Sequence, residues 1–143
     1  MTRPEESVPN GRDVVLAEHR AFRDGVARLR DARSRDEIIS RLLEFRGMSR
    51  AHFAGEEADE GFFESVALSA PRHQAALIEL EREHGEFLHE MDALVVRARE
   101  CSKADLAAVH GGIEALIDRL QDHEARENEI LQEVMNMDLG TGD

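Results

Sequence analysis

The sequence contains no tryptophan, no tyrosine, one cysteine and three prolines. Without tyrosine, phenolate-ligated metal sites and tyrosyl-radical chemistry are excluded. The single cysteine, Cys101, cannot form a disulfide within the chain. No apolar run reaches the roughly 20 residues that span a bilayer, and no leader-like segment precedes the first periodic stretch. We therefore expect a cytoplasmic protein that does not bind membranes.

Positive charge is also scarce, because 18 lysine and arginine residues stand against 31 acidic residues, for a net charge of −13. Phosphate backbones repel such a chain, so we expect no nucleic-acid partner. The 143 residues are the size of one domain, and a domain of this length buries roughly 70% of the surface that its unfolded chain exposes. The sequence carries no indication of an oligomeric state.

Four segments have apolar residues every three or four positions, which is the spacing of one helix face. They begin near Arg12, after Ser34, at Pro71 and after Ser102. Short connections place successive helices antiparallel, so the sequence predicts an all-α, up-down-up-down four-helix bundle over residues 12–136. Residues 1–11 and 137–143 are predicted to be tails. The connection between residues 61 and 71 contains Phe62 and Phe63, which we expect to plug one end of the bundle.

Polar residues interrupt these apolar stripes on all four predicted helices. A histidine or glutamate there would be desolvated, which costs free energy unless the side chain finds a partner. Four of the interrupting residues form two His-x-x-x-Glu pairs, and the members of each pair lie on one helix face. The six residues are His19, His52, Glu56, His84, His123 and Glu127.

The positions of the four histidines along the bundle axis are mutually consistent. His19 and His52 each lie roughly 10 Å from the same end of the bundle, at 1.5 Å per residue. His84 and His123 each lie roughly 20 Å from that end. All four meet at one level if the third and fourth helices extend about two turns beyond the first and second.

A metal cluster explains these interruptions more economically than separately satisfied core histidines, because no lysine or arginine on the stripes can neutralise the glutamates. Imidazole and carboxylate ligands suit iron, manganese or zinc. Two carboxylates with four imidazoles favour a dinuclear site. We therefore expect iron as the cofactor, as two ions per chain joined by an oxo or hydroxo bridge.

The segments AEHRAF, HFAGEE, EREHGEF and HEARENE, in this order on four helices, resemble the hemerythrin HHE cation-binding domain. The resemblance covers roughly residues 12–136. It implies that His19 and His52 bind one iron, that His84 and His123 bind the other, and that Glu56 and Glu127 bridge them. Oxygen-carrying hemerythrins have a further histidine one turn before the equivalent of His84. This chain has Leu80 there, so water or Glu81 would take the place of that ligand.

Other polar residues are interpreted as peripheral to the site. We expect His73, His89 and His110 at the surface or at a bundle end, Glu124 at the surface, and Cys101 to be inert.

Three functions are compatible with these residues. The favoured one is a metal-binding protein, rather than an enzyme, that binds or senses dioxygen, peroxide or nitric oxide. A ferritin-like di-iron oxidase or iron-handling protein is an alternative, but it needs Glu-x-x-His on two helices, and here both such pairs lie on one. A structural zinc-binding interaction bundle is the other alternative.

Overall fold

The computed structural model describes residues 11–141, and these residues are almost entirely helical. The elements in chain order are α1 (Gly11–Asp31), α2 (Arg35–Glu57), α3 (Phe62–Ser69), the 3-10 turn η1 (Pro71–His73), α4 (Gln74–Glu100), the 3-10 turn η2 (Lys103–Asp105) and α5 (Leu106–Thr141). No strand occurs among them. Of the two predicted tails, residues 1–10 and 142–143 lie outside the described residues.

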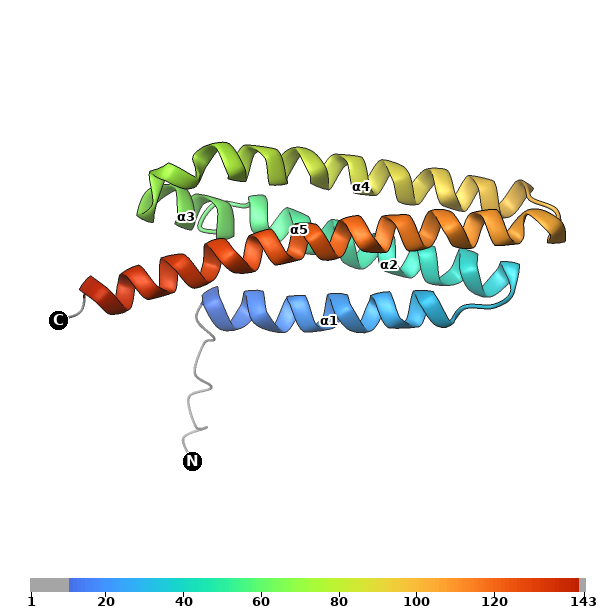
Figure 1. Cartoon of the computed structure of the whole chain (residues 1–143), viewed down its shortest axis with the longest axis horizontal. Helices are drawn as coiled ribbons and strands as arrows, with labels where there is room; N and C mark the ends of the chain where they lie inside the picture. The colour runs from blue at the N-terminus through green and yellow to red at the C-terminus, as the bar shows by residue number, and fades with distance from the viewer. Residues whose placement is uncertain (1–10, 142–143) are drawn as a thin grey trace, which may run out of the picture.

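The four long helices form an antiparallel bundle (Figure 1). Helix α1 contacts α2 and α5, and α4 also contacts α2 and α5, so the helices form a closed ring of neighbours. The α1–α2 and α4–α5 connections lie at one end, while the start of α1, helix α3 and the end of α5 lie at the other (Figure 1). The predicted up-down-up-down bundle is confirmed. No helix in the described part of the chain is long and apolar enough to cross a membrane.

Helix α2 begins directly after Ser34, where the sequence predicts the second helix to start. Ser34 has an extended backbone, and its Oγ accepts a hydrogen bond from the backbone N–H of Glu37 at 3.1 Å. Asp36 and Glu37 lie in the first turn, where the helix dipole favours negative charge. The cap fixes the short turn between α1 and α2.

The connection between residues 61 and 71 differs from the prediction, because most of it is the short helix α3. Phe62, Phe63 and Val66 are buried, so one face of this helix packs onto the bundle. Eight residues are too few for a helical repeat to be recognised between Gly61 and Pro71.

The predicted end of the last helix near residue 136 is also wrong. Helix α5 continues to Thr141 and projects beyond its neighbours (Figure 1). A single glycine weakens a helix by about 1 kcal/mol without forbidding it, so Gly140 does not end α5.

Two apolar clusters fill the bundle, on either side of a polar layer. On α4, Leu80 belongs to the smaller cluster, at the α3 end, and Phe87 belongs to the larger. His84 lies between them in sequence. On α5, Leu120 and Ile130 belong to the larger and the smaller cluster respectively, and His123 and Glu127 lie between these two residues. The site residues therefore occupy a level where the apolar core is interrupted.

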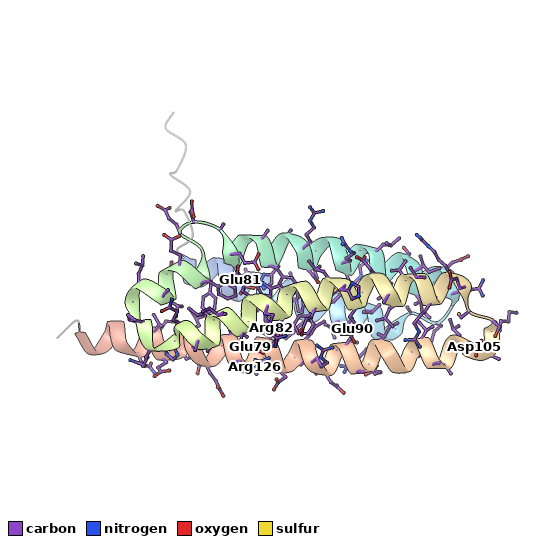
Figure 2. The ribbon with its side chains drawn as sticks, turned by 90° about the horizontal axis from the view of Figure 1, so that it is seen from above. Glu79, Glu81, Arg82, Glu90, Asp105 and Arg126 are labelled. Atoms are coloured by element: carbon purple, nitrogen blue, oxygen red, sulfur yellow. The ribbon has the colours of Figure 1, made fainter. Side chains whose placement is uncertain are left out.

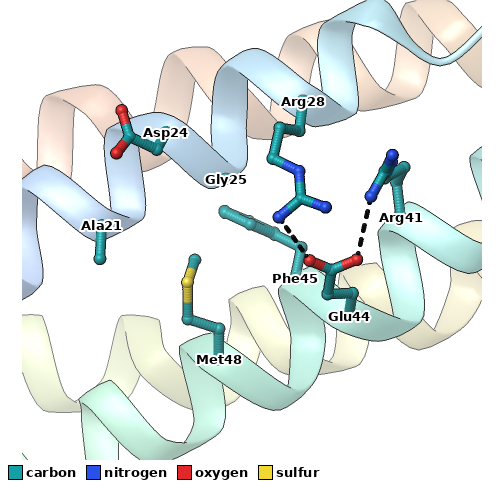
Figure 3. A pocket seen from close by; sticks show the side chains of 8 residues that line it. All are labelled: Ala21, Asp24, Gly25, Arg28, Arg41, Glu44, Phe45 and Met48. Atoms are coloured by element: carbon teal, nitrogen blue, oxygen red, sulfur yellow. Dashed lines mark hydrogen bonds and ion pairs between the residues drawn. The ribbon is translucent and has the colours of Figure 1, made fainter.

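Helices α1 and α2 approach each other closely at Gly25 (Figure 3). A Cβ atom at this position would lie 2.6 Å from Cε of Met48 and 2.9 Å from Cδ2 of Phe45. On the outer side of this contact, Glu44 pairs with Arg28 of α1 at 2.7 Å and with Arg41 at 3.2 Å. Glycine at position 25 thus allows the close approach of α1 and α2, the helices that carry His19 and His52.

Candidate metal centre

The structure brings all six sequence-predicted site residues into one buried cluster. His19 comes from α1, His52 and Glu56 from α2, His84 from α4, and His123 and Glu127 from α5. The most exposed of them, His52, is 8% exposed. Every long helix therefore contributes a side chain that water cannot readily solvate.

Glu127 is surrounded by imidazoles from three helices. Its Oε2 lies 3.0 Å from Nε2 of His19, and its Oε1 lies 2.7 Å from Nε2 of His123 and 3.6 Å from Nε2 of His84. The carboxylate of Glu127 thus lies between one histidine of α1 on one side and one histidine each of α4 and α5 on the other.

Glu56 occupies a similar place between other histidines. Its Oε1 lies 3.3 Å from Nε2 of His52 and 3.4 Å from Nε2 of His84. The i and i+4 spacing of His52 and Glu56 places both on one face of α2. Glu56 therefore connects a histidine of α2 to one of α4.

These contacts define two overlapping groups of four residues, within each of which the potential ligand atoms lie within 4.8 Å of one another. One group is His19, His52, Glu56 and Glu127, and the other is Glu56, His84, His123 and Glu127. The groups share both carboxylates, whereas each has its own pair of histidines. This arrangement can hold two ions joined by two carboxylates.

Several polar atoms at the centre of the cluster lie close to one another without the geometry of a hydrogen bond, and they have no other hydrogen-bond partner. They are both carboxylate oxygens of Glu56, Oε1 of Glu127, and Nε2 of His84 and of His123. Buried polar groups in native proteins are almost always satisfied, since an unsatisfied one costs about 1–3 kcal/mol. The donor set of imidazole nitrogens and carboxylate oxygens fits a metal cation, which would satisfy these atoms together.

Protonation of the metal-free cluster reflects the same crowding. Burial and the nearby charge of Glu127 raise the pKa of Glu56 to about 9. Burial alone would raise the pKa of Glu127 as well, but contacts with His123, His19 and His84 outweigh burial and hold that pKa well below its usual range. Without metal the cluster thus retains protons that a cation would displace.

The same contacts raise the pKa of two of the histidines. Burial lowers the pKa of His84, but its contacts with Glu127, Glu56 and Glu57 outweigh burial and raise that pKa to about 9. The pKa of His19 is raised as well, because Glu127 outweighs the effect of burial.

Three of the histidines have a hydrogen-bond acceptor behind the ring, that is, at Nδ1, the nitrogen that faces away from the cluster. Nδ1 of His19 lies 2.9 Å from Oδ1 of Asn128, Nδ1 of His84 lies 3.0 Å from Oε1 of Glu57, and Nδ1 of His123 lies 3.1 Å from Oε1 of Glu83. An ionised carboxylate only accepts, so Nδ1 of His84 and of His123 must donate. In the neutral imidazole this leaves Nε2 as the nitrogen with a free lone pair, and Nε2 faces the cluster.

Glu83, Glu57 and Asn128 were not predicted as site residues. Glu83 is 8% exposed. Burial raises the pKa of its carboxyl group, but the contacts with Arg126 and His123 outweigh burial and lower it. Each of the three residues is next in sequence to a predicted ligand, but adjacent residues of a helix face different directions, so this position alone does not predict a contact with the site.

Aromatic side chains enclose the cluster. Phe53 stacks on His84 with ring centres 4.0 Å apart, and Phe63 of α3 stacks on the same ring at 5.3 Å. Phe87 meets His123 edge to face at 5.1 Å. Phe62 and Phe63 are buried in the apolar cluster at the bundle end, as predicted, and α3 also carries the ring of Phe63 onto a site histidine.

The alternative ligand Glu81 is not part of the cluster. It is exposed on α4 (Figure 2), whereas Leu80 is 1% exposed in the smaller apolar cluster. Leu80 lies four residues before His84 and shares its inward face of α4. Glu81 lies three residues before His84 and faces outward. A protein ligand therefore comes from neither position.

The prediction that Glu124 is a surface residue is also wrong, because it is 9% exposed. Its Oε1 accepts from Nε of Arg23 at 3.1 Å and lies 4.0 Å from Nδ1 of His19. Glu124 follows the inward His123, which places it where α5 meets α1.

The remaining histidines lie outside the cluster, as predicted. His89 is exposed and His110 is half-buried, and neither belongs to the two groups of potential ligands. His73 pairs with Glu133 at 3.0 Å. Cys101 is half-buried at the end of α4, where its Sγ donates to the carbonyl oxygen of Ala98.

The fold and the cluster define an antiparallel four-helix protein with a buried histidine–carboxylate centre suited to metal cations. The chain belongs to the hemerythrin HHE cation-binding domain family, whose model matches residues 10–134. Neither a curated protein nor a solved structure matches the chain.

Proposed function

We propose that this chain is a non-haem di-iron protein that binds or senses dioxygen or a related small oxidant such as peroxide or nitric oxide. The observation that supports it most is that the two groups of potential ligands share Glu56 and Glu127. A mononuclear site would leave one pair of histidines without a metal.

The ligand chemistry fits iron. Imidazole and carboxylate donors suit iron, manganese and zinc, whereas thiolate ligands favour copper(I), zinc or iron–sulfur clusters. Of the first three metals, iron is the one whose redox chemistry suits the binding of dioxygen. The only cysteine, Cys101, lies at the end of α4, outside both groups of ligands. An iron pair supplies a redox-active position at which a small oxidant can be held.

The surroundings of the cluster favour a small ligand. Leu80 supplies no donor atom, so one coordination position is left to water or to the bound oxidant. Phe53, Phe63 and Phe87 pack around His84 and His123. This apolar enclosure admits small uncharged molecules more readily than large or highly charged ones.

The alternatives are supported less well by the residues. A ferritin-like centre requires Glu-x-x-His on two helices, and in this chain both such pairs lie on α4. A single structural zinc ion would be satisfied by four ligands, two fewer than the cluster offers.

The proposal is tested by metal analysis and an optical spectrum of protein purified without added metal. We expect close to two irons per chain and a visible absorption that zinc cannot produce. A reproducible single zinc ion, with no second metal taken up on reconstitution, would refute the proposal.

A variant pair assigns the metal to the cluster. Glu127→Ala removes a carboxylate shared by both groups, so we expect loss of iron and a smaller melting difference between metal-loaded and metal-free protein. Glu129→Ala is the matched control, because Glu129 is exposed on the same helix. If Glu127→Ala retains its iron and its melting difference, Glu127 is not a ligand.

A further inference from the structure

The two histidine pairs differ in what lies behind their rings. His84 and His123, which belong to the same group of ligands, each donate from Nδ1 to a carboxylate, at 3.0 and 3.1 Å. His19, in the other group, has the neutral amide oxygen of Asn128 at 2.9 Å. A carboxylate is a stronger acceptor than an amide, and it makes the histidine in front of it a more basic metal ligand.

Glu83 is the better fixed of the two carboxylates. It is 8% exposed, and Arg126 of α5 binds the same Oε1 that faces His123. Arg126 lies on α5 beside the part of α4 that carries Glu79 and Arg82 (Figure 2). The side chain of Glu57 is 33% exposed, so water weakens its effect on His84.

The acidic group near His19 does not remove this difference. Oε1 of Glu124 lies 4.0 Å from Nδ1 of His19, beyond hydrogen-bonding distance, and accepts from Arg23 at 3.1 Å. Even with a carboxylate behind His52, the amide behind His19 would leave this group with fewer carboxylate-backed histidines than the group of His84 and His123.

We infer that Glu83 is a positioning residue for His123, and that the metal position served by His84 and His123 binds a divalent cation more tightly than the position served by His19 and His52. This inference rests on the proposed dinuclear function. It predicts that the two positions fill in order rather than together.

The test is an anaerobic titration of the metal-free, full-length protein with Co²⁺, followed by absorption and calorimetry. We expect two ions per chain in two steps, with the first dissociation constant at least about tenfold below the second. Two equal steps would overturn the inference and leave the dinuclear proposal standing. Uptake of only one ion would refute the dinuclear proposal, and the inference with it.

Substitutions at position 83 separate charge from geometry. Glu83→Gln keeps an acceptor of the same shape without the charge, so we expect the first step to weaken about tenfold, and Glu83→Ala to weaken it further. Glu79→Gln is the control, because Glu79 is an exposed residue on the same helix (Figure 2). Melting of the metal-free variants checks that each is folded. If Glu83→Gln behaves like Glu79→Gln, Glu83 does not act through His123.

Two further measurements identify the position that fills first. In protein loaded with one Co²⁺ per chain, we expect the metal to shift the exchangeable ring N–H signal of His123 and to leave the His19 signal in place, and Glu83→Gln should move the His123 signal. The reverse substitution, Asn128→Asp, should strengthen the second step by placing a carboxylate behind His19. A stronger first step in Asn128→Asp would contradict the assigned order.

Discussion

The turn between α2 and α3 depends on two adjacent residues with different backbone requirements. Glu60 has a φ of 63°, the only positive φ among the non-glycine residues described, and such a conformation costs a non-glycine residue about 1 kcal/mol or more. Gly61 has a φ of −78°, so it needs space rather than conformational freedom. A Cβ there would lie 2.8 Å from the carbonyl oxygen of Ala58 and closer still to that of Gly55.

We predict that Gly61→Ala lowers the free energy of unfolding by about 1–3 kcal/mol, because the added methyl group meets backbone oxygens that cannot rotate away. Urea denaturation of the metal-free protein measures the change. Gly47→Ala is the control. A Cβ there has nothing within 4 Å, and alanine should stabilise the interior of α2 by about 0.5–1 kcal/mol. Equal stability of Gly61→Ala and wild type would show that the turn relaxes.

At the scale of residues, the six clustered side chains could be predicted because each interrupts an apolar stripe. Glu83 and Asn128 could not, because they lie beside the stripe, where charged and polar residues are ordinary. Their contacts depend on which ring nitrogen of a neighbouring histidine faces outward. The orientation of the ring is set by the packing of different helices against one another. It therefore cannot be predicted from the residue pattern along one helix.

Among the elements, α3 connects the end of the bundle to the site. Its eight residues bury Phe62, Phe63 and Val66, and Phe63 reaches His84. The long helices were predictable because their apolar repeat persists over many turns, whereas α3 has two turns and lies between glycine and proline. Its role in the site follows from where it packs on α4 and α5.

We predict that Phe63→Ala destabilises the protein by about 3–5 kcal/mol and speeds the loss of metal to a chelator, because water reaches His84 through the space that the ring occupied. Melting and the rate of metal transfer to the chelator measure the two effects. Leu68→Ala, on the same helix, is the control, because Leu68 is 77% exposed and should change neither quantity. Unchanged metal transfer in Phe63→Ala would mean that α3 does not protect the site.

At the scale of the whole molecule, the cluster links stability to pH, and the link differs between the metal-free and the metal-loaded protein. The pKa of His84 and that of Glu56 both rise to about 9 in the folded metal-free protein. Both groups therefore bind protons more strongly when folded. By linkage, the stability contributed by protonated His84 is lost, and the penalty for ionising Glu56 grows, as pH rises from 6.5 toward 9.

We accordingly predict that the melting temperature of the metal-free protein falls between pH 6.5 and about 9. Metal affinity should rise over the same range, because fewer protons compete for the imidazoles and carboxylates. The melting difference between metal-loaded and metal-free protein should therefore widen with pH. Thermal melts across this range measure it, and a constant or narrowing difference would contradict the assigned protonation.

The contact between His19 and Glu127 joins residues 108 positions apart, from the first helix to the last. A chain is synthesised from its amino terminus at a limited rate, and early segments can fold before late ones exist. The carboxylate partner of the α1 imidazole is therefore made only after nearly the whole four-helix domain has been synthesised. Any cation that needs both groups can enter only after translation of this domain is almost complete.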